Sequence, residues 1–322
     1  MLSKQYLSSD ILDNILQPFT LAEITKIEPV ATSGNIAYKI ETKNGAYFFR
    51  LCPTGPRWRS SEEIAAEIEL LDYLYQHKLP VLPALSDKNG QRIISWQGQY
   101  GYLRKFVDAQ EKLDTGIGEI EKFGSMIGSL HELLQNFKTI NKREHIFNPA
   151  HTKEYFFTNK NKILQSDFPD SKKFVDKFEQ EICSLEFPDD LPAGLIHEDL
   201  GRRHVLWCND EITAVIDFDR CYFGKFIWDL GQAARGWCFS RDWHSWQAEN
   251  FIALLKGYQT KRVLTDLEKE YLPMAIRFAI LERALSFCLR FIDVTQDEED
   301  ARFAKQSLFS QLEIIKQIKT AA

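Results

Sequence analysis

The stretch Ile196–Asp219 reads IHEDLGRRHVLWCNDEITAVIDFD, and it decides how the rest of the chain is interpreted. Residues 205–210 and 211–219 have the pattern of two short strands around a turn. Asp199 precedes this hairpin, and Asp217 directly follows the apolar residues of its second strand. Strand interiors disfavour aspartate, and a carboxylate buried without a partner is strongly destabilising. These acids therefore require a partner that compensates for their burial.

Pairing of the two strands would bring the segments before and after the hairpin together, so that Asp199, His204 and Asp217 meet at one rim. An aspartate in a loop or at the end of a strand is by itself an ordinary structural residue. Two acids with a metal-capable side chain between them are typical of sites that hold Mg²⁺ beside a hydroxyl group attacking a phosphoryl group. The sequence thus predicts phosphoryl transfer.

The composition is that of a globular protein with a net negative charge. The 322 residues suffice for two domains of ordinary size. A formal net charge of −6 and a pI of about 5.7 argue against nucleic acid or an anionic membrane surface as a partner. The chain has neither a long apolar run nor a signal-peptide core, so we expect a cytoplasmic protein. The six cysteines show no CxxC pair, which predicts free thiols.

The first third of the chain has the pattern of an antiparallel sheet. A short helix at 8–17 precedes it, and Asn44-Gly45 between two β-rich runs is a strong hairpin signal. Ser60 and Glu63 form a capping box at the start of a helix, with Ile64, Ile68, Leu71 and Tyr75 on one face. The five expected strands are 23–31, 35–42, 46–52, 91–97 and 99–107, and the helix covers 60–80.

The remainder has a helical pattern apart from the central hairpin. Phe123, Ile127, Leu130 and Leu134 form one apolar stripe, whereas 147–169 is ambiguous. The other expected helices are 119–137, 171–187, 229–238, 243–259, 265–293 and 299–319. The fold class is therefore α+β and bilobal, with a β-rich N-terminal lobe at 1–106 and a larger helical lobe at 107–322.

The central stretch resembles the catalytic loop and metal-binding strand of the aminoglycoside phosphotransferase-like kinases, a family with the protein-kinase fold. The family pattern is H-x-D-x-x-x-x-N followed by an I-D-F strand end. The resemblance implies that Asp199 is the catalytic base, Asp217 the principal Mg²⁺ ligand and His197 the structural histidine of the loop. Asp229 would brace the loop from the following helix. His204 stands where the family usually has Asn, and imidazole is a poorer ligand for Mg²⁺ than an amide oxygen.

The same resemblance assigns the nucleotide side, with ATP or GTP and Mg²⁺ as cofactors. A small-residue turn would cover the phosphates, although it is also an ordinary hairpin turn. A strand arginine would contact the phosphates and pair with a helix glutamate, and a hinge would bind the purine. Strand alternation points this arginine away from the opposite apolar face. The residues are Ser33, Gly34, Asn35, Arg50, Glu67, Lys105, Phe106 and Val107.

The resemblance also implies that the phosphoryl acceptor is a hydroxyl group of a small molecule. The segments 190–200 and 229–239 resemble the homoserine kinase branch of the family, although Glu282 stands where Arg is expected. An amino-acid-like alcohol such as homoserine would be bound by arginines in a fork geometry. The arginines considered are Arg202, Arg203, Arg235 and Arg277.

Two alternatives stay open. An aminoglycoside acceptor, being a polycation, would instead be bound by acids, for which the candidates are Asp219, Asp242, Glu249, Glu282 and Asp293. A catalytically weak pseudokinase or nucleotide-binding scaffold is the other alternative, because Arg50 and His204 both depart from the family's commonest residues.

Overall fold

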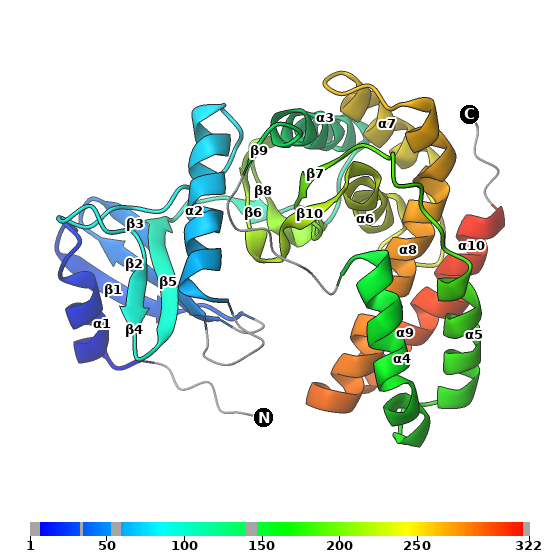
Figure 1. Ribbon diagram of the computed structural model, residues 1–322. Helices are drawn as coiled ribbons and strands as arrows, with labels where there is room; N and C mark the ends of the chain where they lie inside the picture. The colour runs from blue at the N-terminus through cyan, green and yellow to red at the C-terminus, as the bar shows by residue number, and fades with distance from the viewer. Residues whose placement is uncertain (1–6, 33–34, 53–58, 139–146, 318–322) are drawn as a thin grey trace.

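The computed structural model describes residues 7–32, 35–52, 59–138 and 147–317. Its N-terminal part contains the predicted antiparallel sheet of five strands in the order β1-β2-β3-β5-β4 (Figure 1). The expected helices and strands are confirmed, with shorter bounds except for β3, which begins one residue earlier than expected. They are α1 Ser9–Leu16, β1 Ile24–Pro29, β2 Ile36–Thr42, β3 Gly45–Cys52, α2 Ser61–Gln76, β4 Ile94–Trp96 and β5 Gln99–Lys105.

The two faces of the sheet have different partners. Phe49 and Leu51 of β3 pack in one apolar cluster with Leu12 and Leu16 of α1. Arg50, between them in sequence, leaves the opposite face, as strand alternation predicts. The face away from α1 is thus the one that carries charge.

Helix α2 joins the sheet to the helical part of the molecule. Its capping box at Ser60 and Glu63 forms as predicted. The predicted stripe is wrong at Tyr75, which is 56% exposed, because the buried face continues through Leu74. The buried face also includes Glu67 and Leu70, which lie seven and four residues before Leu74, so its centre is closer to Leu74 than to Tyr75. The buried side chains of α2 belong to the same apolar cluster as those of the later helices.

The rest of the chain is mostly helical, as predicted, with small sheets near its middle (Figure 1). The central hairpin is confirmed, since Val205 of β8 pairs with Val215 of β9. The pair β7–β10 and the short β6 beside β8 were not expected. The strands are β6 Gln110–Glu111, β7 Ala193–Ile196, β8 Val205–Cys208, β9 Glu211–Val215 and β10 Tyr222–Lys225. The helices are α3 Ile117–Leu134, α4 Pro149–Gln165, α5 Ser171–Cys183, α6 Phe226–Cys238, α7 Ala248–Gln259, α8 Asp266–Arg290, α9 Glu298–Gln306 and α10 Leu312–Gln317, with π-helical turns at Phe291–Thr295 and Ser307–Gln311.

Two segments differ from the expected helices. The ambiguous segment 147–169 contains α4, which Asn148 caps through a hydrogen bond from the His151 backbone. The helix expected at 243–259 begins only at Ala248, because the preceding residues form a turn closed by a bridge between Phe239 and Trp246.

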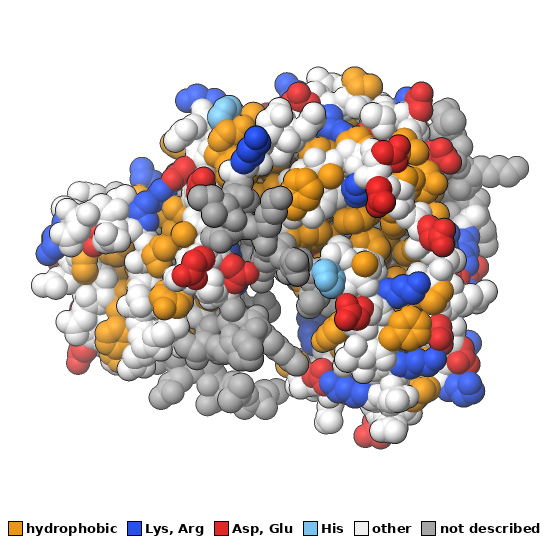
Figure 2. Space-filling model, in the orientation of Figure 1, with side chains coloured by type: hydrophobic (Ala, Val, Ile, Leu, Met, Phe, Trp, Pro, Cys, Tyr) orange, Lys and Arg blue, Asp and Glu red, His pale blue; other side chains and the backbone are white. Residues whose placement is uncertain are grey.

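Surface and thiol features agree with the composition. On the face drawn in Figure 2, the Lys and Arg side chains of the described residues lie among Asp and Glu side chains. Within the described ranges, we find no helix with the length and apolarity needed to cross a bilayer. All six cysteines are free thiols, as predicted.

Candidate active site

The loop that carries Asp199 is held from α6 by Asp229. The two carboxylate oxygens of Asp229 accept the backbone N–H groups of His197, at 2.8 Å, and Glu198, at 2.7 Å. His131 of α3 adds a contact from Nε2 at 3.1 Å. Burial by itself would raise the pKa of Asp229, but these hydrogen bonds outweigh it and lower that pKa. A fully buried, ionised carboxylate therefore fixes the backbone of the loop.

His197 connects the loop to the chain that follows β9. Its Nε2 donates to the Ile216 carbonyl at 3.1 Å, and its Nδ1 accepts the backbone N–H of Asp199 at 3.2 Å. Burial lowers the pKa of His197, so the ring is neutral in this role. The histidine orients Asp199 and is itself inaccessible.

Asp199 lies among three arginines. Arg283 of α8 donates from Nη2 to its Oδ1 at 2.7 Å, while Arg220 and Arg203 each place a guanidinium nitrogen 3.7 Å from Oδ2. Burial would raise the pKa of Asp199, but the charges of Arg283 and Arg220 outweigh burial and hold the pKa far below its usual range. Asp199 is therefore ionised at any pH at which the protein would work.

His204 lies between the two aspartates that the hairpin brings together. Its Nδ1 is 2.6 Å from the Asp199 backbone carbonyl, which can only accept, so Nδ1 carries the proton. The other nitrogen, Nε2, accepts from Arg203 Nε at 3.2 Å and lies 3.2 Å from Asp217 Oδ2. The lone pair of His204 Nε2 thus faces a carboxylate oxygen of Asp217.

This donor pair fits a divalent cation. The Asp217 side chain is 42% exposed, and its backbone has a left-handed φ of 68° directly after β9. Within the described residues, no three or more His, Cys, Asp or Glu side chains are arranged to hold a metal ion. Mg²⁺ bound by His204 and Asp217 would complete its shell with water and phosphate oxygens, as it commonly does.

The strand arginine that is expected to contact the phosphates belongs to a ring of four charged groups. Arg50 lies 2.6 Å from Glu67 of α2 and 2.6 Å from Asp219, both through guanidinium nitrogens. Arg59 contacts the same two carboxylates, at 3.0 Å from Asp219. Burial would lower the pKa of Arg50, but Asp219 and Glu67 outweigh it and keep the group charged. The ring ties β3 and α2 to the residue two positions after Asp217.

The structure describes only some of the other residues that are expected to bind the nucleotide. Asn35 donates from its amide to Asp219 at 3.3 Å, whereas Ser33 and Gly34 lie outside the described residues. At the expected hinge, the backbone N–H of Phe106 donates to the Ala46 carbonyl at 2.9 Å and is therefore not available to a purine. The neighbouring positions are Lys105, the exposed last residue of β5, and Val107, which is half-buried.

The arginines expected to bind the acceptor are in different places. Arg202 donates to the backbone carbonyls of Gly236 and Trp237, so we assign it to the folding of the loop. Arg277 pairs with Glu181 of α5 at 3.0 Å, on a side of α8 that does not carry the Asp199 contact. Asp219 pairs with Arg50 and Arg59. Arg235 of α6 is buried.

Several residues of the site were not expected from the sequence. Arg59, Arg220 and Arg283 reach it from segments whose relative positions only the fold determines. Glu198 has a φ of 70°, and it contacts Arg220 and Gln232 from a buried position. Burial raises the pKa of Glu198 well above its usual range, with Arg220 opposing the effect. Its place between the histidine and aspartate of the H-x-D motif was a signal that could have drawn attention to it.

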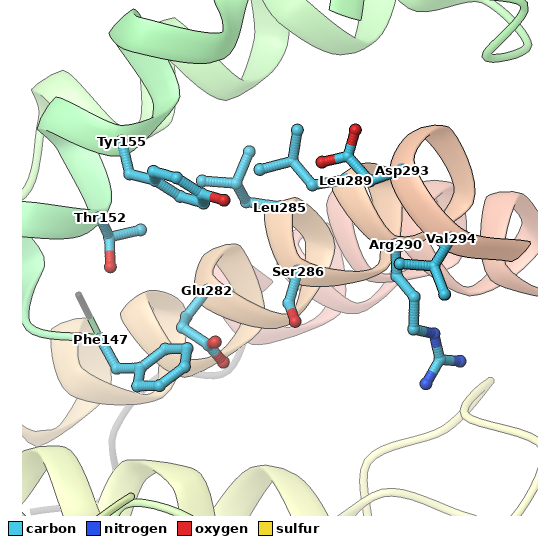
Figure 3. A pocket seen from close by; sticks show the side chains of 10 residues that line it. All are labelled: Phe147, Thr152, Tyr155, Glu282, Leu285, Ser286, Leu289, Arg290, Asp293 and Val294. Carbon is cyan, nitrogen blue, oxygen red and sulfur yellow. The ribbon is translucent and has the colours of Figure 1, made fainter. Parts of the chain in front are cut away.

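A cavity of about 210 Å³ lies between α4 and α8 (Figure 3). Tyr155 and Thr152 face it from α4, and Leu285 and Ser286 from α8. Glu282 at one end of the cavity also pairs with Arg220 at 3.0 Å, which links the cavity to the group around Asp199.

The comparison with known families agrees with this geometry. Residues 26–270 match the phosphotransferase enzyme family, and the chain belongs to this family. It is therefore an ATP-dependent small-molecule kinase that acts on hydroxyl groups.

Individual phosphotransferases are similar to this chain in sequence or in structure. A homoserine kinase of Zymomonas mobilis is 27% identical over 241 residues, which cover 73% of this chain and 72% of the relative. A homoserine kinase of Pseudomonas aeruginosa is 25% identical, with 88% and 85% covered. Among solved structures, an amicoumacin kinase matches with a TM-score of 0.71 at 17% identity (94% and 93% covered), and a microcompartment-associated aminopropanol kinase with 0.67 at 17% (96% and 97%). A spectinomycin phosphotransferase matches with 0.68 at 15% identity (97% and 99% covered). These similar structures show that the chain has the fold of a kinase-like phosphotransferase.

Proposed function

We propose that this protein transfers the γ-phosphoryl group of ATP to the hydroxyl group of an amino-acid-like alcohol such as homoserine. The observation that carries the proposal is the ionised Asp199 carboxylate, adjacent to the His204–Asp217 pair and surrounded by arginines. Residues 1–106 would form the nucleotide-binding lobe and residues 107–322 the acceptor-binding lobe. The names of the relatives support the same acceptor class.

Each charged group has a role in this reaction. Asp199, ionised and fixed by its loop, would orient the acceptor hydroxyl and accept its proton as the phosphorus–oxygen bond forms. Arg50 and Arg59 would contact the nucleotide phosphates from β3 and the start of α2. His204 and Asp217 would hold Mg²⁺, which supplies neutralisation of the charge that develops on the phosphate oxygens.

The charges favour an anionic or zwitterionic acceptor over an aminoglycoside. Of the acids that would bind a polycation, Asp219, Glu282 and Asp293 are each paired with an arginine or lysine of the protein. The groups nearest to Asp199 are cationic. A polycation would have to displace these side chains, whereas a carboxylate would be attracted to them.

The test is a kinase assay with ATP and Mg²⁺ on L-homoserine, choline and kanamycin, repeated with Asp199→Asn. We expect turnover of L-homoserine and a loss of about a thousandfold or more in kcat for the variant, because the carboxylate acts in the transition state. Phosphorylation of kanamycin, without phosphorylation of L-homoserine or choline, would contradict an amino-acid-like acceptor and favour an aminoglycoside acceptor. Absence of turnover together with normal nucleotide binding would favour the scaffold alternative.

A further inference from the structure

Arg235 of α6 is a buried cation with few partners. Its side chain is about nine-tenths buried, and its guanidinium lies over the Trp243 ring at 4.8 Å from the centroid. One nitrogen is 3.4 Å from Ser307 Oγ, a weak contact, and the buried Nε has no hydrogen-bond partner. Among the described residues, no carboxylate lies within ion-pair distance of Arg235. A buried guanidinium in this state would gain free energy from binding an anion.

The packing of α6 on α8 places Arg235 near a second arginine. The two helices approach so closely at Gly231 that a Cβ there would lie 2.6 Å from the Ala275 carbonyl oxygen. Further along both helices, Gln232 donates to Glu282 at 3.3 Å. Arg235 lies one turn after Gln232 on α6, and Arg283 directly follows Glu282 on α8. Burial and the charge of this neighbour lower the pKa of Arg235 to about 9.

Arg283 is also the closest partner of Asp199. Its Nη2 donates to Asp199 at 2.7 Å, and its Nε lies 3.2 Å from Glu282 Oε2. The guanidinium carries five N–H groups, so part of its donor capacity remains for a further anion. The same contact occupies an oxygen of the carboxylate that has to meet the acceptor hydroxyl.

We propose that Arg235 and Arg283 form the subsite that binds the carboxylate of the acceptor, and that this carboxylate draws Arg283 away from Asp199. This proposal rests on the proposed function. It specifies that the acceptor is recognised by its carboxylate and explains why acceptors with a carboxylate would be preferred. An acceptor with a carboxylate would free the base that its own hydroxyl needs. An acceptor without one would leave Asp199 paired with Arg283.

The experiment compares L-homoserine with L-homoserine amide, in which only the carboxylate is replaced. Both are assayed with ATP and Mg²⁺ on the wild type, Arg283→Gln, Arg235→Gln and the control Arg277→Gln, which alters an ion pair of α8 with α5. We expect the wild type to prefer the carboxylate by about a hundredfold, since an arginine fork binding a carboxylate is a strong charge-assisted contact. Arg283→Gln should reduce this preference to below about tenfold, because the variant loses more activity on L-homoserine than on the amide.

Two further readouts distinguish recognition from a structural effect. Arg235→Gln should raise the KM for L-homoserine about tenfold or more with little change in kcat, because it removes a binding contact. Arg277→Gln should keep the wild-type preference. Equal loss of both acceptors in the two site variants would overturn the proposal.

A binding measurement distinguishes failure of the proposed function from failure of the proposed subsite. If the wild type phosphorylates neither acceptor, L-2-aminobutyrate, which keeps the carboxylate and lacks the hydroxyl, is titrated into the complex with Mg²⁺ and a non-hydrolysable ATP analogue. Binding that Arg235→Gln weakens at least tenfold would support the subsite without the homoserine reaction. Absence of binding to the wild type would overturn the subsite.

Discussion

Asp199 illustrates how the neighbours of a single residue set its chemistry. Arg283, Arg220 and Arg203 keep the carboxylate ionised, yet the 2.7 Å contact with Arg283 also occupies it. A weakly basic carboxylate suits phosphoryl transfer, in which positioning and electrostatics contribute more than proton abstraction. In the proposed reaction this carboxylate would orient the acceptor hydroxyl, and the proposed subsite would release it from Arg283.

His204 allows a prediction about metal preference. Imidazole suits Mn²⁺ better than the hard Mg²⁺ ion, whereas an amide oxygen suits Mg²⁺. We expect His204→Asn to retain activity. The Mg²⁺ concentration that gives the half-maximal rate should fall several-fold in this variant relative to the corresponding Mn²⁺ concentration. The measurement is the rate as a function of each metal concentration. Asp217→Asn serves as the control and should lose activity with both metals; an unchanged Mg²⁺/Mn²⁺ ratio in His204→Asn would remove His204 from the metal site.

Among elements, the catalytic loop depends most clearly on a neighbour, because Asp229 of α6 binds two of its backbone N–H groups. We expect Asp229→Asn to lower the free energy of unfolding at pH 7 by about 2–4 kcal/mol, since two hydrogen bonds to a buried charge are weakened. Urea denaturation of both proteins measures this difference.

The pH dependence of that difference follows from the lowered pKa of Asp229. A carboxyl group whose pKa is lower in the folded state contributes its full stabilisation above the unfolded value of about 3.9 and loses it as the pH falls through the folded value. The gap between wild type and Asp229→Asn should therefore be constant from pH 8 to pH 5 and narrow only in stronger acid. A gap that disappears near neutral pH would contradict an ionised Asp229.

At the scale of the whole molecule, Asp219 connects the sheet and α2 to the segment that follows β9 through Arg50 and Arg59. A nucleotide bound between these parts would offer phosphates to both arginines. We expect Arg59→Gln to raise the Kd for ATP about 10–100-fold, which corresponds to loss of one charge-assisted contact. Titration with a fluorescent ATP analogue measures this. Arg92→Gln, which alters an ion pair with Asp72 on another part of α2, is the matched control and should leave the Kd unchanged.

Local signals in the sequence were sufficient for the sheet, the helices with strong stripes and the central hairpin. Asn44-Gly45, the box at Ser60 and the apolar stripe from Phe123 to Leu134 each act within a few residues, so no tertiary information is needed to interpret them. The convergence of Asp199, His204 and Asp217 also followed from the hairpin, because its two strands are adjacent in the chain.

The acceptor side was decided only by the tertiary structure. Arg235, Arg277 and Arg283 all lie in helices with similar local patterns, and helix periodicity alone does not tell which of them faces Asp199. That choice depends on how α6 packs on α8, a contact between segments more than forty residues apart in the chain. The sequence by itself determined the reaction class through the hairpin and its acids. The long-range packing of helices decided which cations surround the base, because side-chain charges act through space and not along the chain.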